Sequence, residues 1–402
     1  MNPPTARALL PRASVDVMRV LIAPDSFTGT LSAMQASEAI ADGWQRTSPN
    51  DVVHQLPLSD GGPGFVSVIH GGLGGQLHPV TISGPLGEPT LADVLIVDRD
   101  GAKTAYLESS QACGLHLVPR GKRDPRRTST FGLGELVRHA VALGARQIVI
   151  GLGGTGTNDA GAGLLAALGA KAQGVSGVDC TDALRNGGAA LTGITAVDLT
   201  DVRSAVDGVE LVVASDVDNP LLGLRGATNG YARQKGADDG AVMELEGALE
   251  NFVAALGRRA DGKDPAVALG AGAGGGLGFA LMHLGASRVP GIATVLETVG
   301  LVGLIANSDV VVTGEGSFDW QSLRGKVVSG VASAALEQGR PCVVIAGRVE
   351  VGRREFAASG VTAAFAVVDD VRARGLDEQM AINDASAQVA ELAARVARTW
   401  GS

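Results

Sequence analysis

The chain has 402 residues, of which 19% are charged and 45% are apolar, a composition that fits a globular protein with more than one core. Its net charge of −9 and the lack of a long basic run argue against a nucleic-acid partner. Three scattered cysteines and six histidines without metal-ligand spacing argue against a disulfide framework and a zinc site, and favour a cytoplasmic location.

Neither the start of the chain nor its longest apolar region predicts a membrane segment. Residues 1–17 lack the apolar core of a signal peptide, so we expect a flexible tail there. The apolar region 291–306 is interrupted by Glu297 and by glycines, and it is shorter than the roughly 20 residues of a membrane span. We therefore expect no contact with a membrane.

The first predicted unit is a strand, a polar turn and a helix. The apolar run "VMRVLIA" at 17–23 predicts the strand, and "PDSFTGT" forms the turn. Ser32 and Gln35 have the spacing of a capping box at the start of the helix. This turn could hold an anion, yet it contains no lysine or arginine.

The same unit recurs along the chain. "VVHQLPL" leads into "SDGGPG", "RQIVIGLGG" leads into "TGTNDAGAG" and a helix, and "SDVVVTGEG" leads into "SFDWQSLRGK" and a helix near Val331–Leu336. Such alternation predicts an α/β fold with largely parallel strands. Because ligands bind beyond the carboxyl ends of strands in open α/β sheets, we expect these loops to converge on one cleft.

Two regions depart from this alternation. "QLHPVTIS", "LADVLIV" and "TAYLES", between 75 and 110, read as strands with no room for helices between them, so they predict an antiparallel portion. Residues 377–399 read as one long amphipathic helix. No low-complexity linker divides the chain, and a second domain is therefore expected as an insertion.

The glycine-rich stretch "GLGGTGTNDAGAG" at 151–163 is the strongest candidate for a binding loop. It satisfies G-x-G-x-x-G, but so does "GAGAGG" at 270–275, and the pattern has little specificity in a chain with 58 glycines. A nicotinamide-dependent oxidoreductase stays as one alternative. Short polar side chains at the predicted start of the helix favour a phosphate-binding loop instead, although each of these side chains could also serve as a helix cap.

Polar side chains follow the other predicted strands as well. Asp60 lies in "SDGGPG", Asp216 in "ASDVDNPL" and Glu315 in "TGEGSFDWQSLRGK", which ends on Lys326. Such carboxylates can ligate Mg²⁺ or accept a proton from an attacking hydroxyl, although loops also carry them as turn formers and ion pairs. A Walker A loop and the protein-kinase signature motifs are both missing.

Taken in their order along the chain, the motifs resemble those of one family, the bacterial glycerate kinases of the first type. The matching stretches are "APDSFTGTLSA", "LSDGGPGF", "SGPLGEP", "GLGGTGTNDAGAG", "SDVDNPLLG", "RQKGA", "GAGAGGGLG" and "TGEGSFDWQSLRGK". The resemblance implies transfer of the γ-phosphoryl group of ATP to a hydroxyl of D-glycerate with Mg²⁺, giving 2-phosphoglycerate in preference to 3-phosphoglycerate. It also implies a flavodoxin-like domain from 18–70 and 295–402, an inserted α/β domain at 71–294, and an active site in the cleft between them.

Site residues follow from the motifs and the resemblance. We predict substrate binding by Asp25, Ser26 and Thr28, catalysis by Asp60, Asp216 and Lys326, and metal binding by Asp216 and Glu315. We predict phosphate or nucleotide binding by Gly153, Gly154, Thr155, Gly156, Thr157, Asn158, Lys235, Gly274 and Gly275.

Two positions depart from the family pattern. Thr28 stands where the family usually has lysine, and Pro63 stands where glutamate is common. These departures keep a second alternative open, a paralogue that binds glycerate or another small hydroxy acid without efficient phosphorylation. The sequence leaves a homodimer open as the assembly.

Overall fold

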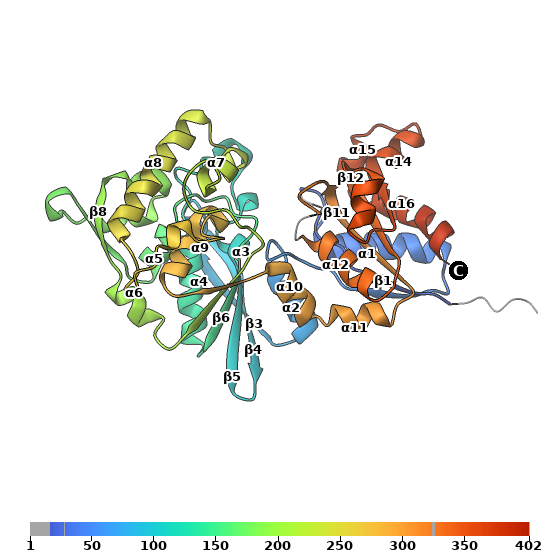
Figure 1. The fold of residues 1–402 in the computed structure, drawn as a ribbon, viewed down its shortest axis with the longest axis horizontal. Helices are drawn as coiled ribbons and strands as arrows, with labels where there is room; N and C mark the ends of the chain where they lie inside the picture. Colours follow the sequence, from blue (N-terminus) through green and yellow to red (C-terminus); the bar gives the residue numbers. More distant parts are fainter. Residues whose placement is uncertain (1–16, 28, 324–325, 402) are drawn as a thin grey trace, which may run out of the picture.

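The computed structural model describes residues 17–27, 29–323 and 326–401. Within these ranges, the chain forms two main sheets with helices packed on them (Figure 1). None of the helices described has both the length and the hydropathy that crossing a membrane requires.

The first sheet is a five-stranded parallel sheet in the order β13-β12-β11-β1-β2. Its strands are β1 Arg19–Ile22, β2 Val52–Gln55, β11 Val310–Phe318, β12 Cys342–Val349 and β13 Ala363–Ala366. Numbered in chain order within this sheet, the strands run 2-1-3-4-5, which is the flavodoxin order. The expected flavodoxin-like α/β fold is therefore confirmed.

The second sheet has six strands in the order β10-β9-β6-β5-β4-β3. Its strands are β3 Gln76–Ser83, β4 Pro89–Arg99, β5 Ala102–Glu108, β6 Gln147–Gly151, β9 Glu210–Ala214 and β10 Ser287–Val289. β3, β4 and β5 pair antiparallel, as the sequence predicts, while β5, β6, β9 and β10 are parallel. A separate antiparallel pair consists of β7 Lys171–Gly174 and β8 Ile194–Asp198.

The helices cover the faces of both sheets (Figure 1). Those associated with the first sheet are α1 Ala33–Thr47, α11 Leu301–Ala306, α12 Val327–Glu337, α13 Arg353–Ala358, α14 Val367–Ala373, α15 Met380–Asn383 and α16 Ala385–Trp400. Those associated with the second are α3 Ser109–Cys113, α4 Phe131–Ala142, α5 Ala162–Ala167, α6 Thr200–Ala205, α7 Ala227–Tyr231, α8 Asp239–Leu256 and α9 Ala273–His283. Two helices, α2 Phe65–Leu73 and α10 Gly291–Thr298, lie between the two sheets (Figure 1).

Two helix predictions need correction. The expected single helix over 377–399 is wrong, because Asp384 has φ −131° and ψ 43° and separates α15 from α16. Asn and Asp compete with helical hydrogen bonds through their own side chains, which favours a break at this point. α12 starts at Val327, earlier than the expected start near Val331.

The capping box of α1 is confirmed. The side chain of Ser32 accepts a hydrogen bond from the Gln35 N–H at 3.2 Å, and the Gln35 side chain accepts one from the Ser32 N–H at 2.9 Å. α1 then packs closely on α16, where a Cβ at Gly43 would lie 2.1 Å from the carbonyl oxygen of Ala390. This contact fixes one face of the first sheet.

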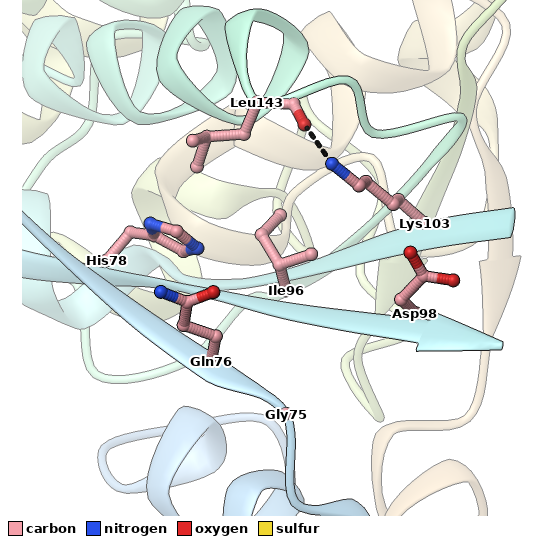
Figure 2. Close-up of a pocket in the computed structure, with 7 residues that line it drawn as sticks. All are labelled: Gly75, Gln76, His78, Ile96, Asp98, Lys103 and Leu143. Atoms are coloured by element: carbon pink, nitrogen blue, oxygen red, sulfur yellow. Dashed lines mark hydrogen bonds between the residues drawn. The ribbon is translucent and has the colours of Figure 1, made fainter. Parts of the chain in front are cut away.

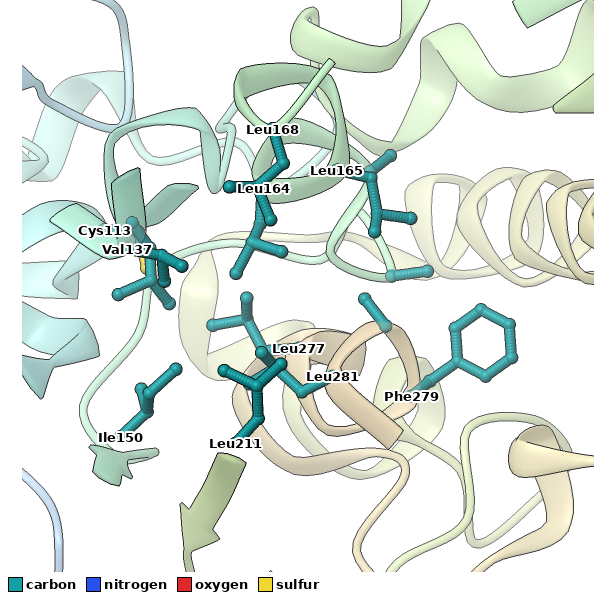
Figure 3. Packing of buried hydrophobic residues seen from close by; sticks show 14 of the residues in the cluster. Cys113, Val137, Ile150, Leu164, Leu165, Leu168, Leu211, Leu277, Phe279 and Leu281 are labelled. Atoms are coloured by element: carbon teal, nitrogen blue, oxygen red, sulfur yellow. The ribbon is translucent and has the colours of Figure 1, made fainter. Parts of the chain in front are cut away.

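Two hydrophobic cores hold the region around the strand ends. One surrounds the second sheet, and Figure 3 shows apolar side chains from α4, α5, α9, β6 and β9 facing one another there. The other contains Leu21 and Val311 of the first sheet, Val149 and Val212 of the second, and residues of α2, α10 and α11. Because this second core contains residues of both sheets, it joins them. Burial of each such side chain contributes about 1.5–3 kcal/mol.

All strands of the second sheet lie between β2 and β11 in the chain. This region enters the sheet at β3 and leaves it at β10, which are the two edge strands. The domain limits given above stay predictions.

Candidate functional site

Four acidic residues lie at the carboxyl ends of parallel strands. Asp25 follows β1, Asp60 follows β2 and Asp216 follows β9. Glu315 lies on β11, beyond Val312. Val312 pairs with Ile22, the last residue of β1, so Glu315 also lies past the end of β1. We call these four residues the carboxylate cluster, because the charge of Asp60 acts on each of the other three.

Asp25 is fixed by the backbone around it. Its N–H donates to the carbonyl of Gly314 at 2.8 Å, and its carboxylate accepts the Ser26 N–H at 2.6 Å. Burial and the charge of Asp60 raise the pKa of this carboxyl well above its ordinary value, and Glu315 raises it further. The carboxyl of Asp25 is therefore harder to ionise than an ordinary aspartate side chain.

Asp216 connects the second sheet to the start of α10. One carboxylate oxygen accepts the N–H of Gly291 at 3.1 Å, and the other accepts that of Ile292 at 2.9 Å. A Cβ at Gly291 would lie 2.2 Å from the carbonyl oxygen of Asp60, so only glycine lets these two acidic residues flank the same turn. Burial raises the pKa of Asp216 to about 6 despite the two N–H donors.

Glu315 is the most deeply buried member of the cluster. Its side chain is 6% exposed, and one carboxylate oxygen, Oε1, is buried with no hydrogen-bond partner among the described residues. Burial raises the pKa to about 7, although a hydrogen bond from Ser322 and the charge of Lys326 lower it. The unpartnered oxygen is thus available to a ligand.

Lys326 supplies positive charge at this end of the site. It is the N-cap residue of α12, lies half-buried, and lowers the pKa of both Asp25 and Glu315. The structure therefore brings the predicted residues Asp25, Asp60, Asp216, Glu315 and Lys326 into one electrostatic group. Thr28 lies outside the described residues.

The glycine-rich loop after β6 is held by buried hydrogen bonds. The Asp159 carboxylate accepts from the Thr130 N–H and hydroxyl at 2.8 and 2.9 Å, and from the N–H groups of Gly161 and Gly163 at 3.1 and 3.3 Å. The side-chain amide of Asn158 donates to the Thr228 hydroxyl at 3.0 Å. These contacts fix the loop before any ligand binds.

Lys235 lies buried against the same loop. Its ammonium group donates to the carbonyl of Thr157 at 2.7 Å and to the hydroxyl of Thr155 at 3.4 Å. Burial lowers its pKa to about 8, while the nearby Cys113 and Asp159 groups oppose this. The cation therefore holds the backbone of the predicted phosphate loop and adds positive potential behind it.

The second glycine-rich stretch packs on the first. Gly274, Gly275 and Gly276 all have left-handed backbone conformations, and a Cβ at Gly275 would lie 2.0 Å from the carbonyl oxygen of Thr157. The N–H of Ala160 donates to the carbonyl of Gly275 at 3.0 Å. The structure thus brings the two predicted glycine-rich loops together.

Glycines also connect this loop to the carboxylate cluster. A Cβ at Gly153 would lie 2.5 Å from Cα of Gly62, and one at Gly151 would lie 2.6 Å from the carbonyl oxygen of Gly61. Pro63 follows them, and its ring contacts the position that a Gly154 side chain would take. The Asp60 loop of the first sheet therefore lies directly on the glycine-rich loop of the second.

Sequence reasoning missed the polar residues at the end of β5. The Glu108 carboxylate accepts hydrogen bonds from the Val66 N–H at the start of α2 and from the Ser110 hydroxyl. Ser109 accepts the N–H of Gly153 at 3.3 Å. The signal was present, since "TAYLESS" is an apolar strand followed by an acid and two hydroxyls, the same pattern as at the other strand ends.

A separate cavity of about 340 Å³ lies elsewhere (Figure 2). Its lining consists of Gly75, Gln76, His78, Ile96, Asp98, Lys103 and Leu143, none of which belongs to the predicted site. Lys103 is near the start of β5, whereas Glu108 is at its end. The cavity and the predicted binding loops therefore lie at opposite ends of the strands.

Comparison with known proteins agrees with this α/β class of fold. A crystal structure assigned as glycerate kinase 2 from Salmonella typhimurium LT2 matches 96% of this chain and 98% of its own, with a TM-score of 0.72 and 34% identity. The family model described as the glycerate kinase family matches residues 20–401. The chain therefore belongs to the glycerate kinase family.

Individual relatives match over nearly their whole length. The glycerate kinase of Halalkalibacterium halodurans is 39% identical over 95% of this chain and 98% of its own. The glycerate kinase of Bacillus subtilis is 38% identical over 95% and 96%. The glycerate 2-kinase of Escherichia coli K12 is 37% identical over 88% and 91%.

Proposed function

We propose that this chain transfers the γ-phosphoryl group of ATP to the 2-hydroxyl of D-glycerate and so forms 2-phosphoglycerate. Family membership supports the kinase chemistry, and the relative from Escherichia coli that is named a glycerate 2-kinase supports the choice of hydroxyl. The observation that carries the proposal is the direct contact between the Asp60 loop and the glycine-rich loop, because phosphoryl transfer needs carboxylates beside a phosphate-binding backbone.

We assign a Mg²⁺ ion to the carboxylate cluster. Among the described residues, three or more His, Cys, Asp or Glu side chains nowhere gather closely enough to hold a metal alone. Mg²⁺ commonly uses one or two carboxylates and completes its coordination with phosphate and water, so this is compatible with the ion. Glu315, with its buried unpartnered oxygen, and Asp216 would hold it, and the ion would neutralise charge on the phosphates.

The remaining residues divide between the two reactants. Asp25 and Ser26, together with Thr28, would orient glycerate, and Lys326 would face its carboxylate or the transferred phosphoryl group. The backbone from Gly153 to Asn158 would bind the nucleotide phosphates, with Gly274 and Gly275 supporting it. Asp60 lies between the two sheets and is the candidate for accepting the proton of the attacking hydroxyl.

An assay of the purified protein tests this function. D-glycerate, ATP and Mg²⁺ should yield ADP, and NMR of the product should show phosphate on the 2-oxygen. Asp60→Asn and Asp216→Asn should each reduce kcat by at least about a hundredfold if these carboxylates act in the reaction. Failure to release ADP with glycerate or a panel of small hydroxy acids would refute the proposal.

Thr28 favours one second candidate, a protein that binds a hydroxy acid without efficient turnover. A threonine at the family lysine position removes one cation from the loop after β1. Calorimetry that shows tight glycerate binding together with no ADP release would support it. In an active enzyme, Thr28→Lys should lower KM for glycerate if the site lacks a needed charge.

A further inference from the structure

A short basic stretch runs beside the glycine-rich loop and has no role in the proposed function so far. "RGKRDPRR" at 120–127 contains five cationic residues and a single acid. Glycine, aspartate and proline interrupt it, so it does not form a long basic run. It connects α3 to α4 at the strand-end side of the second sheet.

Hydrogen bonds attach the residues on either side of this stretch to the loop. Just after it, the Thr128 hydroxyl donates to the carbonyl of Gly156 at 2.9 Å. Before it, the N–H of Leu115 donates to the carbonyl of Gly154 at 2.9 Å, and the carbonyl of Cys113 accepts the N–H of Gly156 at 2.7 Å. The stretch is therefore fixed next to the predicted phosphate-binding backbone.

The stretch also touches the residues that support the loop. A Cβ at Gly236, next to Lys235, would lie 2.3 Å from the carbonyl oxygen of Arg123. A Cβ at Gly187 would lie 2.7 Å from Cα of Arg127, and one at the adjacent Gly188 would lie 2.3 Å from the carbonyl oxygen of Asn158. The backbone of the basic stretch therefore packs against residues that flank and support the loop.

Most of these cations have no acidic partner. Arg126 pairs with Asp124 at 2.9 Å and with Glu244 at 3.3 Å. Within the described part of the chain, Arg120, Lys122, Arg123 and Arg127 form no ion pair, and Arg120, Lys122 and Arg127 are exposed. Four unpaired cations in a protein of net charge −9 create a local positive field at this position.

The buried lysine of the site cannot supply that field outward. The ammonium group of Lys235 is hydrogen-bonded to Thr157 and Thr155 and lies inside the protein. Nucleotide phosphates approaching the loop would also meet the negative carboxylate cluster. Cations beside the loop would offset this repulsion and could form charge-assisted hydrogen bonds to phosphate oxygens.

We propose that Arg120, Lys122, Arg123 and Arg127 form a cationic arm that binds the polyphosphate of a nucleoside triphosphate at the glycine-rich loop. The proposal rests on the proposed function, since it extends the nucleotide site of the same enzyme. It assigns the arm to the phosphates and not to the base or ribose, so its contribution grows with the number of phosphates.

Nucleotide binding by the full chain tests the arm directly. A triple variant, Arg120→Gln, Lys122→Gln and Arg127→Gln, leaves out the half-buried Arg123. Calorimetry at low salt should show affinity for Mg-ATP weakened by about tenfold or more, and affinity for AMP changed by less than about twofold. The loss should shrink at high salt, because salt screens exposed charges.

A matched control removes the same number of charges elsewhere. Arg99, Arg203 and Arg398 are exposed, form no ion pair among the described residues, and lie on β4, α6 and α16. Changing all three to Gln should alter Mg-ATP affinity by less than about twofold. Equal losses in both triple variants, or equal losses for ATP and AMP, would overturn the proposal.

These readouts separate the arm from the enzyme activity. Weakened Mg-ATP binding in a chain that phosphorylates no hydroxy acid would support the arm and overturn the proposed function. Active phosphorylation of glycerate with an unchanged KM for ATP in the triple variant would overturn the arm alone. Absence of nucleotide binding by the unaltered chain would overturn both.

Discussion

Glu315→Gln should stabilise the protein at neutral and alkaline pH while it removes activity. Burial raises the pKa of Glu315 from 4.5 to about 7, so between these values the unfolded chain is ionised and the folded chain is not. The folded state then binds more protons, and stability falls as pH rises through this window. Above pH 7 the full cost of the buried charge remains.

The magnitude follows from the difference between the two pKa values. At about 1.4 kcal/mol per pKa unit, the shift corresponds to about 3 kcal/mol. Glutamine has nearly the same shape and no charge, so it should add about 3 kcal/mol to the free energy of unfolding at pH 8. Below pH 4.5 the carboxyl is neutral in both states, and the variant should match the unaltered protein.

Urea unfolding at pH 4.5, 6 and 8 without Mg²⁺ measures this difference. Glu337→Gln, at an exposed position at the end of α12, is the control and should stay within about 0.5 kcal/mol of the unaltered protein at each pH. The Glu315→Gln protein should also lose turnover. Active sites commonly keep a residue that the reaction needs even though it lowers the stability of the fold. A gain that does not change with pH, or a less stable variant at pH 8, would refute the reasoning.

Two further substitutions test the glycine-rich loop. Asp159→Ala removes the acceptor of four buried hydrogen bonds and should cost about 4 kcal/mol in unfolding free energy. Its control, Asp198→Ala, removes exposed hydrogen bonds to Thr200 and should cost about 1 kcal/mol or less. Similar costs for the two variants would contradict the role given to burial. Gly153→Ala should place a methyl group 2.5 Å from Cα of Gly62, lower kcat, and destabilise by about 1–3 kcal/mol in thermal unfolding. Gly71→Ala, which has open space around it on α2, serves as its control and should leave kcat unchanged.

Local patterns predicted the elements and their order. The capping box of Ser32 and Gln35 needs only neighbouring residues, and the alternation of apolar strands with polar loops placed Asp25, Asp60 and Asp216 at strand ends. The long-range contacts were out of reach, because nothing near Gly62 in the chain indicates that it meets Gly153. Family resemblance supplied the flavodoxin-like fold, which the strand order confirms.

Burial was the other property that sequence patterns could not give. The sequence predicts that Lys235 binds phosphate, yet it lies inside the protein with its ammonium group on the Thr157 carbonyl. Nothing in the sequence of 120–127 indicates its neighbours, yet a hydrogen bond from the adjacent Thr128 fixes this stretch against Gly156. In both cases the tertiary packing of the loop decides which cations face the solvent.

The two edge strands at which the inserted region joins the rest of the chain have a mechanical consequence. β3 and β10 are separated by the full width of a six-stranded sheet, roughly 24 Å at about 4.8 Å per strand. The chain closes this gap outside the sheet, because a Cβ at Gly72, which precedes β3, would lie 2.9 Å from Cγ1 of Val299, which follows β10. The inserted region is therefore held by two neighbouring connections and not by two distant tethers, and deletion of residues 73–298 leaves two ends that a short linker can join.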